Sequence, residues 1–302
     1  RAAVAYLATV AARAPVLLVF DDLHWADEET LALLTALATD PDTGPVLIVG
    51  TYRTTETSAA LTDALGRTAR AEPARIYLGG LPEPRVRELV RALTDGARSD
   101  GTHADRAMTP DAARLIHERS AGNPFFVREL TRLWESEGEA GLHTVPPGVR
   151  ETIRHRLAAL TGTARTQLRQ AAVIGPEIDL DLLIPLAGDE QLVLDTVESA
   201  LLAGFLVERD ADRLRFTHAL VHETLYDDIA LARRARWHAS VAGIIEEVRP
   251  DDVMAIAHHL LRAGSRAPGA RTAHYTRAAA ERAERRSAPH EAARLWRETV
   301  AA

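Results

Sequence analysis

Hydrophobic residues in the first 80 positions gather in short continuous runs separated by an amphipathic stretch. Residues 16–20 and 46–49 are apolar throughout, which is typical of strands buried on both faces of a parallel sheet. Between them, Asp27 is a suitable N-cap for a helix that carries leucines on one side. A strand, a helix and a second strand in this order predict half of a doubly wound α/β sheet. Residues 75–78 could add one further strand.

The hydrophobic spacing becomes helical from residue 81 onward, and no clear strand interrupts it over a long stretch. The glycine, asparagine and proline at positions 122–124 end one helix and begin the next. Residues 145–148 read Val-Pro-Pro-Gly, a composition shift that predicts a domain boundary. Three periodic helices beyond it, followed by a hairpin around residues 205–217, have the outline of a winged helix.

Small alanines recur at helical spacing from about residue 237, as in repeat arrays of antiparallel helices. The predicted fold class is therefore α/β, with a partial parallel sheet, followed by an all-α lid, a winged helix and the start of a tetratricopeptide-like helical-repeat array. The predicted domains are residues 1–80, 81–145, 146–236 and 237–302.

The amino-acid composition of the chain excludes several classes of function. A hydrophobic content of 46% in 302 residues is enough for a sizeable core. The net charge of -7 opposes a broad electrostatic grip on nucleic acid. The absence of cysteine excludes disulfides and thiolate metal sites and fits a reducing cytosol, so we expect a cytoplasmic protein. The apolar runs are too short to span a bilayer, and no membrane partner is expected.

Two carboxylates, Asp21 and Asp22, directly follow the first predicted strand. A nucleoside triphosphatase needs acids at this place: Asp21 would hold Mg²⁺ through water, and Asp22 would orient the attacking water. The alternative is structural, with both acids merely ending the strand and capping the next helix.

The sequence of residues 19–27, Val-Phe-Asp-Asp-Leu-His-Trp-Ala-Asp, closely resembles the Walker B segment of LuxR-type bacterial regulators and their adenylyl-cyclase-associated relatives. The resemblance continues in order through four further segments, and it reaches to about residue 240. These segments are Gly-Thr-Tyr-Arg at 50–53, Gly-Leu-Pro at 80–82, Ser-Ala-Gly-Asn-Pro-Phe-Phe at 120–126 and Arg-Phe-Thr-His-Ala-Leu-Val-His-Glu-Thr-Leu-Tyr at 215–226.

This resemblance implies a signal-transduction ATPase with a partial P-loop NTPase sheet in residues 1–80. ADP would clamp the core, lid and winged helix into a closed form, and exchange for ATP would loosen it. The implied cofactors are ATP or ADP and Mg²⁺. The implied partners are an unidentified inducer or regulatory protein bound by the helical repeats, and DNA only through a helix-turn-helix that is not visible in these residues.

Further binding residues follow from the resemblance. Arg53 would read the γ-phosphate at the carboxyl edge of the sheet; the alternative is a surface arginine that pairs with Glu56. Pro124, together with Asn123, would lie against the adenine, and both residues also serve as ordinary helix-start residues.

His218 matches the histidine that holds the ADP β-phosphate in related switch ATPases; the alternative is a core or helix-start histidine. A third possibility arises because His218 and His222 share one helix face and Glu223 is adjacent, a spacing that could bind zinc. The metalloprotease signature needs glutamate directly after the first histidine, where Ala219 stands. The adjacent His258 and His259 point to different helix faces and suggest no site.

The sequence contains no lysine and no glycine-rich loop ending in Lys-Ser or Lys-Thr, so the phosphate cradle is absent. We expect that loop upstream of Arg1, and we expect residues 1–302 alone to bind ATP weakly or not at all. ATPase activity is implied for the family member as a whole. Both cofactors would require the upstream loop.

Two other functions compete with the switch. A winged helix can read DNA, but over residues 208–215 arginines alternate with acids and leave no basic stripe. Alternatively, the chain is a degenerate ATPase that serves as a protein-interaction scaffold. An intact upstream phosphate loop would favour the switch, and a broken one the scaffold.

Overall fold

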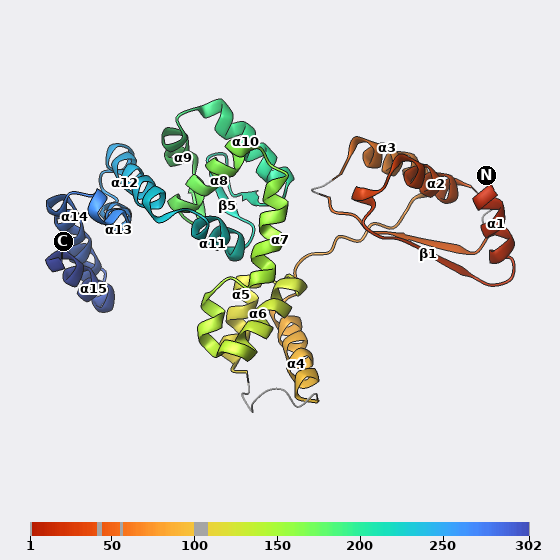
Figure 1. Cartoon of the computed structure of the whole chain (residues 1–302), viewed down its shortest axis with the longest axis horizontal. Helices are drawn as coiled ribbons and strands as arrows, with labels where there is room; N and C mark the ends of the chain where they lie inside the picture. Colours follow the sequence, from red (N-terminus) through yellow and green to blue (C-terminus); the bar gives the residue numbers. More distant parts are fainter. Residues whose placement is uncertain (1, 41–43, 55–56, 100–107, 302) are drawn as a thin grey trace. The chain divides into compact units, whose positions relative to one another are not determined.

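The structure is a computed structural model that describes residues 2–40, 44–54, 57–99 and 108–301. It divides into two units, Arg1–Leu78 and Gly79–Ala302 (Figure 1). Most of the described residues are helical, and the parallel sheet is small. This agrees in coarse outline with the predicted order, in which an α/β segment is followed by helices.

The first unit is built on two parallel strands, β1 (Val16–Phe20) and β2 (Val46–Gly50). Their register sets Val16 opposite Val46 and Phe20 opposite Gly50, so the two strands end at the same level. The predicted cap is confirmed, because the Asp27 side chain accepts a hydrogen bond from the Thr30 N–H at 2.8 Å at the start of α2. The helices of this unit are α1 (Ala2–Ala11), η1 (Leu23–Trp25), α2 (Glu28–Thr39), α3 (Ala59–Thr68) and η3 (Ala69–Ala71).

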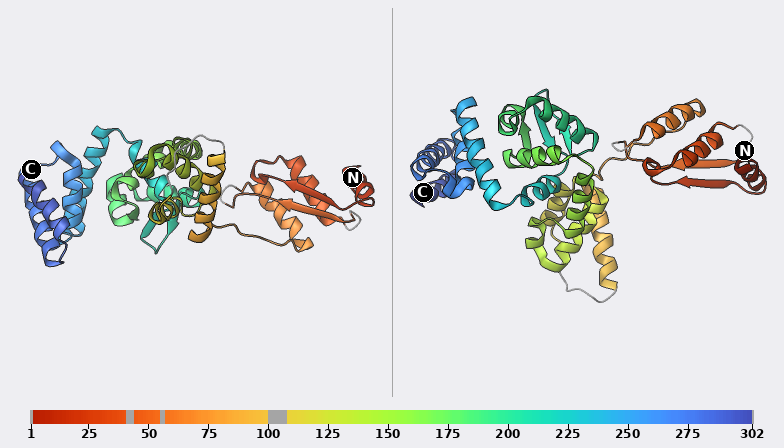
Figure 2. Two further views of the ribbon diagram at one scale, coloured as in Figure 1. Left: turned by 90° about the horizontal axis from the view of Figure 1, so that it is seen from below. Right: turned by 45° about the horizontal axis from the view of Figure 1, so that its top comes forward.

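The sheet of the first unit has one covered and one open face. Helices α2 and α3 lie on one side of the strands (Figure 2), and their leucines pack against Phe20 and Ile48. On the opposite face Leu17 and Leu47 are 61% and 64% exposed. The prediction that both faces are buried is therefore wrong for the described residues, because α2 and α3 cover only the face of Phe20 and Ile48.

The possible third strand at residues 75–78 is not formed, and Ile76, Tyr77 and Leu78 are exposed. A strand needs a neighbouring edge to pair its backbone groups. Within the described chain these residues pair with neither β1 nor β2, so their β-type side chains alone do not make a strand.

The second unit contains, over residues 79–227, a set of helices and a small antiparallel sheet with the strand order β3-β5-β4. The hairpin predicted around residues 205–217 is present as β4 (Leu206–Glu208) and β5 (Arg213–Phe216), whereas β3 (Glu177–Asp179) was not predicted from the sequence. The helices are α4 (Glu83–Ser99), α5 (Pro110–Ser120), α6 (Pro124–Glu137), η4 (Gly138–His143), α7 (Pro147–Ala158), α8 (Gly162–Ile174), α9 (Leu180–Ala187), α10 (Glu190–Leu202) and α11 (Ala219–Asp227).

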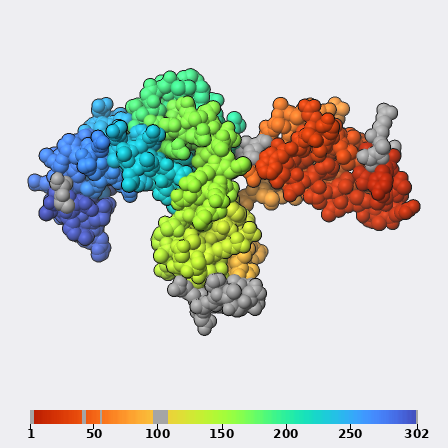
Figure 3. Space-filling model, viewed as in Figure 1, coloured from red at the N-terminus to blue at the C-terminus, as the bar shows by residue number. Residues whose placement is uncertain are grey.

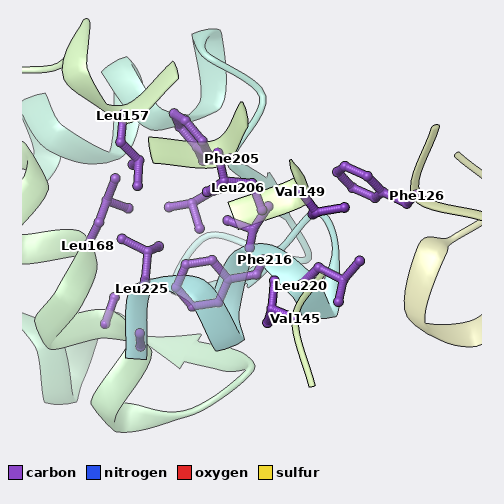
Figure 4. Close-up of a cluster of buried hydrophobic side chains, with 14 of the residues drawn as sticks. Phe126, Val145, Val149, Leu157, Leu168, Phe205, Leu206, Phe216, Leu220 and Leu225 are labelled. Atoms are coloured by element: carbon purple, nitrogen blue, oxygen red, sulfur yellow. The ribbon is translucent and has the colours of Figure 1, made fainter. Parts of the chain in front are cut away.

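One hydrophobic cluster joins these helices and the sheet (Figure 4). It runs from Val86 on α4 to Leu225 on α11 and passes through Val145 and Val149, on either side of the predicted boundary at residues 145–146. Residues of the predicted lid and of the predicted winged helix therefore share a core. The four predicted domain limits stay predictions.

The remaining helices pack in sequence, each against the next. They are α12 (Leu231–Val248), α13 (Val253–Ala263), η5 (Gly264–Arg266), α14 (Gly269–Arg285) and α15 (Pro289–Ala301). Ala279, Ala280, Ala283 and Ala292 are buried in one cluster with Leu295, and their small side chains allow α14 and α15 to approach closely. The outer surface of these helices is blue in the space-filling view (Figure 3). None of the described helices is both long and apolar enough to cross a membrane.

Candidate functional site

The two predicted acids lie where the parallel strands end. Asp21 and Asp22 directly follow β1, and Thr51 directly follows β2. Because the strands are in register, Thr51 reaches both acids: its hydroxyl donates to Asp21 Oδ1 and accepts the backbone N–H of Asp22 at 3.0 Å. Its own N–H donates to the carbonyl of Phe20 at 2.9 Å, which continues the strand ladder. Thr51 thus fixes the acid pair.

The backbone at Asp22 turns sharply, with φ at 53°, in the left-handed region that non-glycine residues rarely adopt. The next N–H, of Leu23, donates to the Thr51 carbonyl at 2.8 Å and holds this turn. Leu23 and His24 are buried, while both acid side chains stay exposed. His24 Nε2 lies 3.8 Å from Asp22 Oδ1.

The implied cofactor is ATP or ADP with Mg²⁺, and this geometry fits the Mg²⁺ ion. Exposed carboxylate oxygens are the ligands that Mg²⁺ prefers, and Asp21 keeps its second oxygen free of the Thr51 hydrogen bond. These 302 residues do not contain the groups that bind the phosphates of a nucleotide, because the sequence has neither lysine nor a phosphate-binding loop. Sequence reasoning missed Thr51, although its position directly after the second strand was the available signal.

Arg53 is exposed three positions beyond the end of β2. Its alternative partner, Glu56, lies outside the described residues. The proposed contact with a γ-phosphate stays a prediction.

Asn123 and Pro124 form the start of α6 as expected of a helix junction. The Asn123 side-chain oxygen accepts from the backbone N–H groups of Phe125 at 3.0 Å and Phe126 at 3.3 Å, and Pro124 occupies the first turn. The capping role is therefore present in the structure. A contact between Pro124 and adenine stays a prediction.

The structure brings this junction against the Gly-Leu-Pro segment at residues 80–82. The Leu81 N–H donates to the Gly122 carbonyl at 2.8 Å. A Cβ atom on Gly122 would lie 2.1 Å from the Leu81 carbonyl oxygen, and one on Gly80 would lie 2.0 Å from the Ala121 carbonyl oxygen. Gly122 also has a φ of 74°. Two motifs about 40 residues apart thus meet backbone to backbone, and only glycine permits this approach.

His218 directly precedes α11 and lies shortly after β5. Its ring packs edge to face on Phe126, with ring centroids 5.3 Å apart, so it stands beside the first turn of α6. Its Nδ1 is buried without a hydrogen-bond partner among the described residues. Burial, with help from the nearby Arg156 and Arg215, lowers the pKa of His218, which keeps the ring neutral at physiological pH.

The residues of the possible zinc site have other partners. His222 Nε2 lies 2.9 Å from the Ala172 carbonyl oxygen, and Glu223 forms an ion pair with Arg119. Arg119 is buried and also donates to the carbonyls of Leu142 and, at 3.1 Å, Thr144. The part of the chain that the structure describes contains no group of three His, Asp or Glu side chains able to hold a metal. The Arg119–Glu223 pair links α5 to α11, and no local pattern in the sequence indicated it.

A second buried polar chain links α11, α12 and α13. Arg262 donates to the Tyr226 hydroxyl at 3.1 Å, Tyr226 Oη lies 3.0 Å from His238 Nε2, and His238 Nδ1 lies 2.8 Å from His259 Nδ1. Arginine can only donate, and when the tyrosine hydroxyl donates to Nε2 of His238, the Nδ1–H of His238 donates to His259. Burial lowers the pKa of His238 and of His259 to about 3, and both rings are neutral. Sequence reasoning saw no role for His259 because its partner is on another helix.

Comparison with known proteins finds a family model that matches part of the first unit. The model of the AAA ATPase domain family matches residues 1–49, a stretch that contains β1, the acid pair and most of β2. An uncharacterized protein of Rhizobium meliloti (strain 1021) is 28% identical over 282 residues, which are 87% of this chain and 26% of that protein. The chain thus spans about a quarter of the length of this curated relative.

Among solved structures, the chain is similar to a Signal Transduction ATPase with Numerous Domains (STAND) protein with a tetratricopeptide repeat sensor from Pyrococcus horikoshii. The TM-score is 0.37 at 13% sequence identity, and the similarity covers 98% of this chain and 44% of that structure.

Proposed function

We propose that the chain is part of a nucleotide-gated, signal-responsive regulator of the LuxR type, a signal-transduction ATPase. The observation that carries the proposal is the arrangement of Asp21, Asp22 and Thr51 at the carboxyl end of a parallel sheet. The two acids lie within residues 1–49, which match the AAA ATPase domain family. Ligands bind at this edge in open α/β sheets. ATP or ADP with Mg²⁺ is the proposed ligand.

In this function Asp21 would hold Mg²⁺, and Asp22 would orient the attacking water. Arg53, beyond the end of the neighbouring strand, contacts the γ-phosphate. The exposure of all three side chains supports these roles, because each is open to a ligand. The phosphate cradle and its lysine would come from a loop upstream of Arg1.

In the second unit, Pro124 and Asn123 would bind the adenine, and His218 would donate a hydrogen bond to the ADP β-phosphate. The unpartnered Nδ1 of His218 and its contact with the first turn of α6 support a shared site for these residues. We propose that α7, α8, α10 and the hairpin of β4 and β5 form a winged helix, with His218 as its nucleotide-dependent latch. Closed and open forms then differ by contacts that ADP and ATP make unequally.

The helices from α12 onward would bind the inducer or regulatory protein, and DNA would be bound by a further module. A degenerate ATPase that acts as a protein-interaction scaffold is the second candidate, favoured by the complete absence of lysine from these residues. Nucleotide binding separates the two functions, because a scaffold does not depend on the acid pair.

The test uses a form of the protein that carries a phosphate-binding loop upstream of Arg1. Asp21→Ala is expected to abolish the Mg²⁺-dependent part of ATP affinity in titration calorimetry, whereas Asp22→Asn is expected to leave binding and slow hydrolysis at least tenfold. Glu29→Gln, which removes an exposed acid on α2, is the matched control. If both acid variants bind and hydrolyse ATP like the control, the acids are structural and the proposal fails.

A further inference from the structure

The second unit contains a cleft lined mainly by charged side chains, far along the chain from the acid pair. It has a volume of about 560 Å³ and lies where α7, α8 and the end of α11 meet. Its polar lining consists of four arginines and two aspartates around the buried Leu157: Arg150, Arg154, Arg165, Arg169, Asp227 and Asp228.

Half of its arginines already have acidic partners. Arg154 forms a two-point hydrogen bond with Asp228, at 2.9 Å through Nε and 2.5 Å through a terminal nitrogen. Arg150 lies 3.4 Å from Asp227 and 4.0 Å from Asp228. These pairs tie α7 to the end of α11, and they neutralise two of the four positive charges.

The other two arginines lack acidic partners. Arg165 and Arg169 are one helical turn apart on α8, so they project from the same face. Both are half-buried, and neither forms an ion pair within the described residues. The Nε atom of Arg169 is buried and has no hydrogen-bond partner there. Buried polar atoms are nearly always satisfied, so this N–H is a donor that an acceptor entering the cleft could use.

We propose that this cleft, with Arg165 and Arg169 as its anchors, binds the phosphate group of a small phosphorylated molecule. Four arginines against two aspartates leave two positive charges, and a phosphate monoester carries about -1.5 to -2 at pH 7. The planar guanidinium fork matches phosphate oxygens in two-point geometry. A volume of about 560 Å³ lies in the range of small-molecule sites.

A nucleic-acid backbone fits this cleft less well. The chain carries a net charge of -7, and Asp227 and Asp228 line the cleft, so a long polyanion would meet repulsion beyond the two anchors. A single compact dianion avoids this repulsion. The site is independent of the proposed nucleotide switch, because it uses none of its residues.

The experiment titrates the 302-residue chain with inorganic phosphate, followed by calorimetry and by the melting temperature at constant ionic strength. The test variant is Arg165→Gln with Arg169→Gln. The control is Arg236→Gln with Arg286→Gln, which removes the same charge from exposed arginines of the same unit. We expect saturable binding that the test variant weakens at least tenfold, about 1.4 kcal/mol, and that the control retains. Phosphate should raise the melting temperature of the parent and control only.

The melting temperature without phosphate separates a binding role from a structural one. Removing two like charges that lack partners is expected to leave it unchanged or to raise it. A fall together with equal phosphate affinity in both variants would overturn the proposal, as would the absence of saturable binding to the parent. Arg165→Lys with Arg169→Lys keeps the charge but not the fork, and we expect intermediate affinity. A short DNA duplex that binds more tightly than phosphate through the same two arginines would also overturn it.

Discussion

Acidification is expected to destabilise the joint between α11, α12 and α13, because it contains two buried neutral histidines. His238 and His259 share one hydrogen bond between their Nδ1 atoms at 2.8 Å, and only one proton can occupy it. Protonating the acceptor would set two N–H groups against each other, in a region where Arg262 and Arg234 already add positive charge. The folded chain therefore resists protonation, whereas the unfolded chain does not.

The size of the effect follows from proton linkage. Burial lowers the pKa of both histidines from 6.5 to about 3, so the unfolded chain binds two more protons than the folded chain in this interval. A lowered histidine pKa means stability that is present above pH 6.5 and is lost as the pH falls toward 3. Below pH 6.5 each histidine lowers the free energy of unfolding by about 1.4 kcal/mol per pH unit. Between about pH 7.5 and about pH 5.5 the pair lowers the free energy of unfolding by about 2.7 kcal/mol.

Urea unfolding followed by circular dichroism across this pH range measures how steeply the free energy of unfolding changes with pH. In His259→Asn the new amide oxygen takes the place of the accepting Nδ1, so the hydrogen bond from His238 is kept while one titrating group is lost. The slope contributed by the pair should then halve. His274→Asn, which changes an exposed histidine on α14, is the control. A free energy of unfolding that stays flat down to about pH 5.5, or a slope that His259→Asn leaves unchanged, would refute the reasoning.

Two further predictions concern single side chains of the second unit. Arg119→Met is expected to lower the free energy of unfolding by about 3 kcal/mol, because it leaves Glu223 and two carbonyls without their buried donor. Burial already raises the pKa of Glu223, and Arg132→Met, at an exposed ion pair, should cost under about 1 kcal/mol in the same denaturation assay. His218→Ala, in a form of the protein that binds nucleotide, is expected to speed ADP release roughly tenfold or more in a stopped-flow chase. An unchanged release rate with a lowered melting temperature would leave His218 as an ordinary packing residue.

Local sequence patterns determined which segments form strands and helices where the signal is complete within the segment. The apolar runs that became β1 and β2 and the Asp27 cap were predictable because each depends on side chains a few residues apart. The same holds for the alanine-rich pairs α14 and α15. Residues 75–78 show the limit of this reasoning, since a strand also needs a partner edge, which no segment encodes by itself.

Only the tertiary structure decided which distant residues meet. The acid pair was visible in the sequence, but Thr51 became its partner through the parallel register of β1 and β2. The close approach of Gly122 to Leu81 likewise brings together segments about 40 residues apart. Arg119 reaches Glu223 over 104 positions, and His238 reaches His259 over 21. Sequence periodicity reports which face of an element is apolar, whereas these contacts depend on how whole elements pack, so they emerge only when the hydrophobic core has fixed the helices in place.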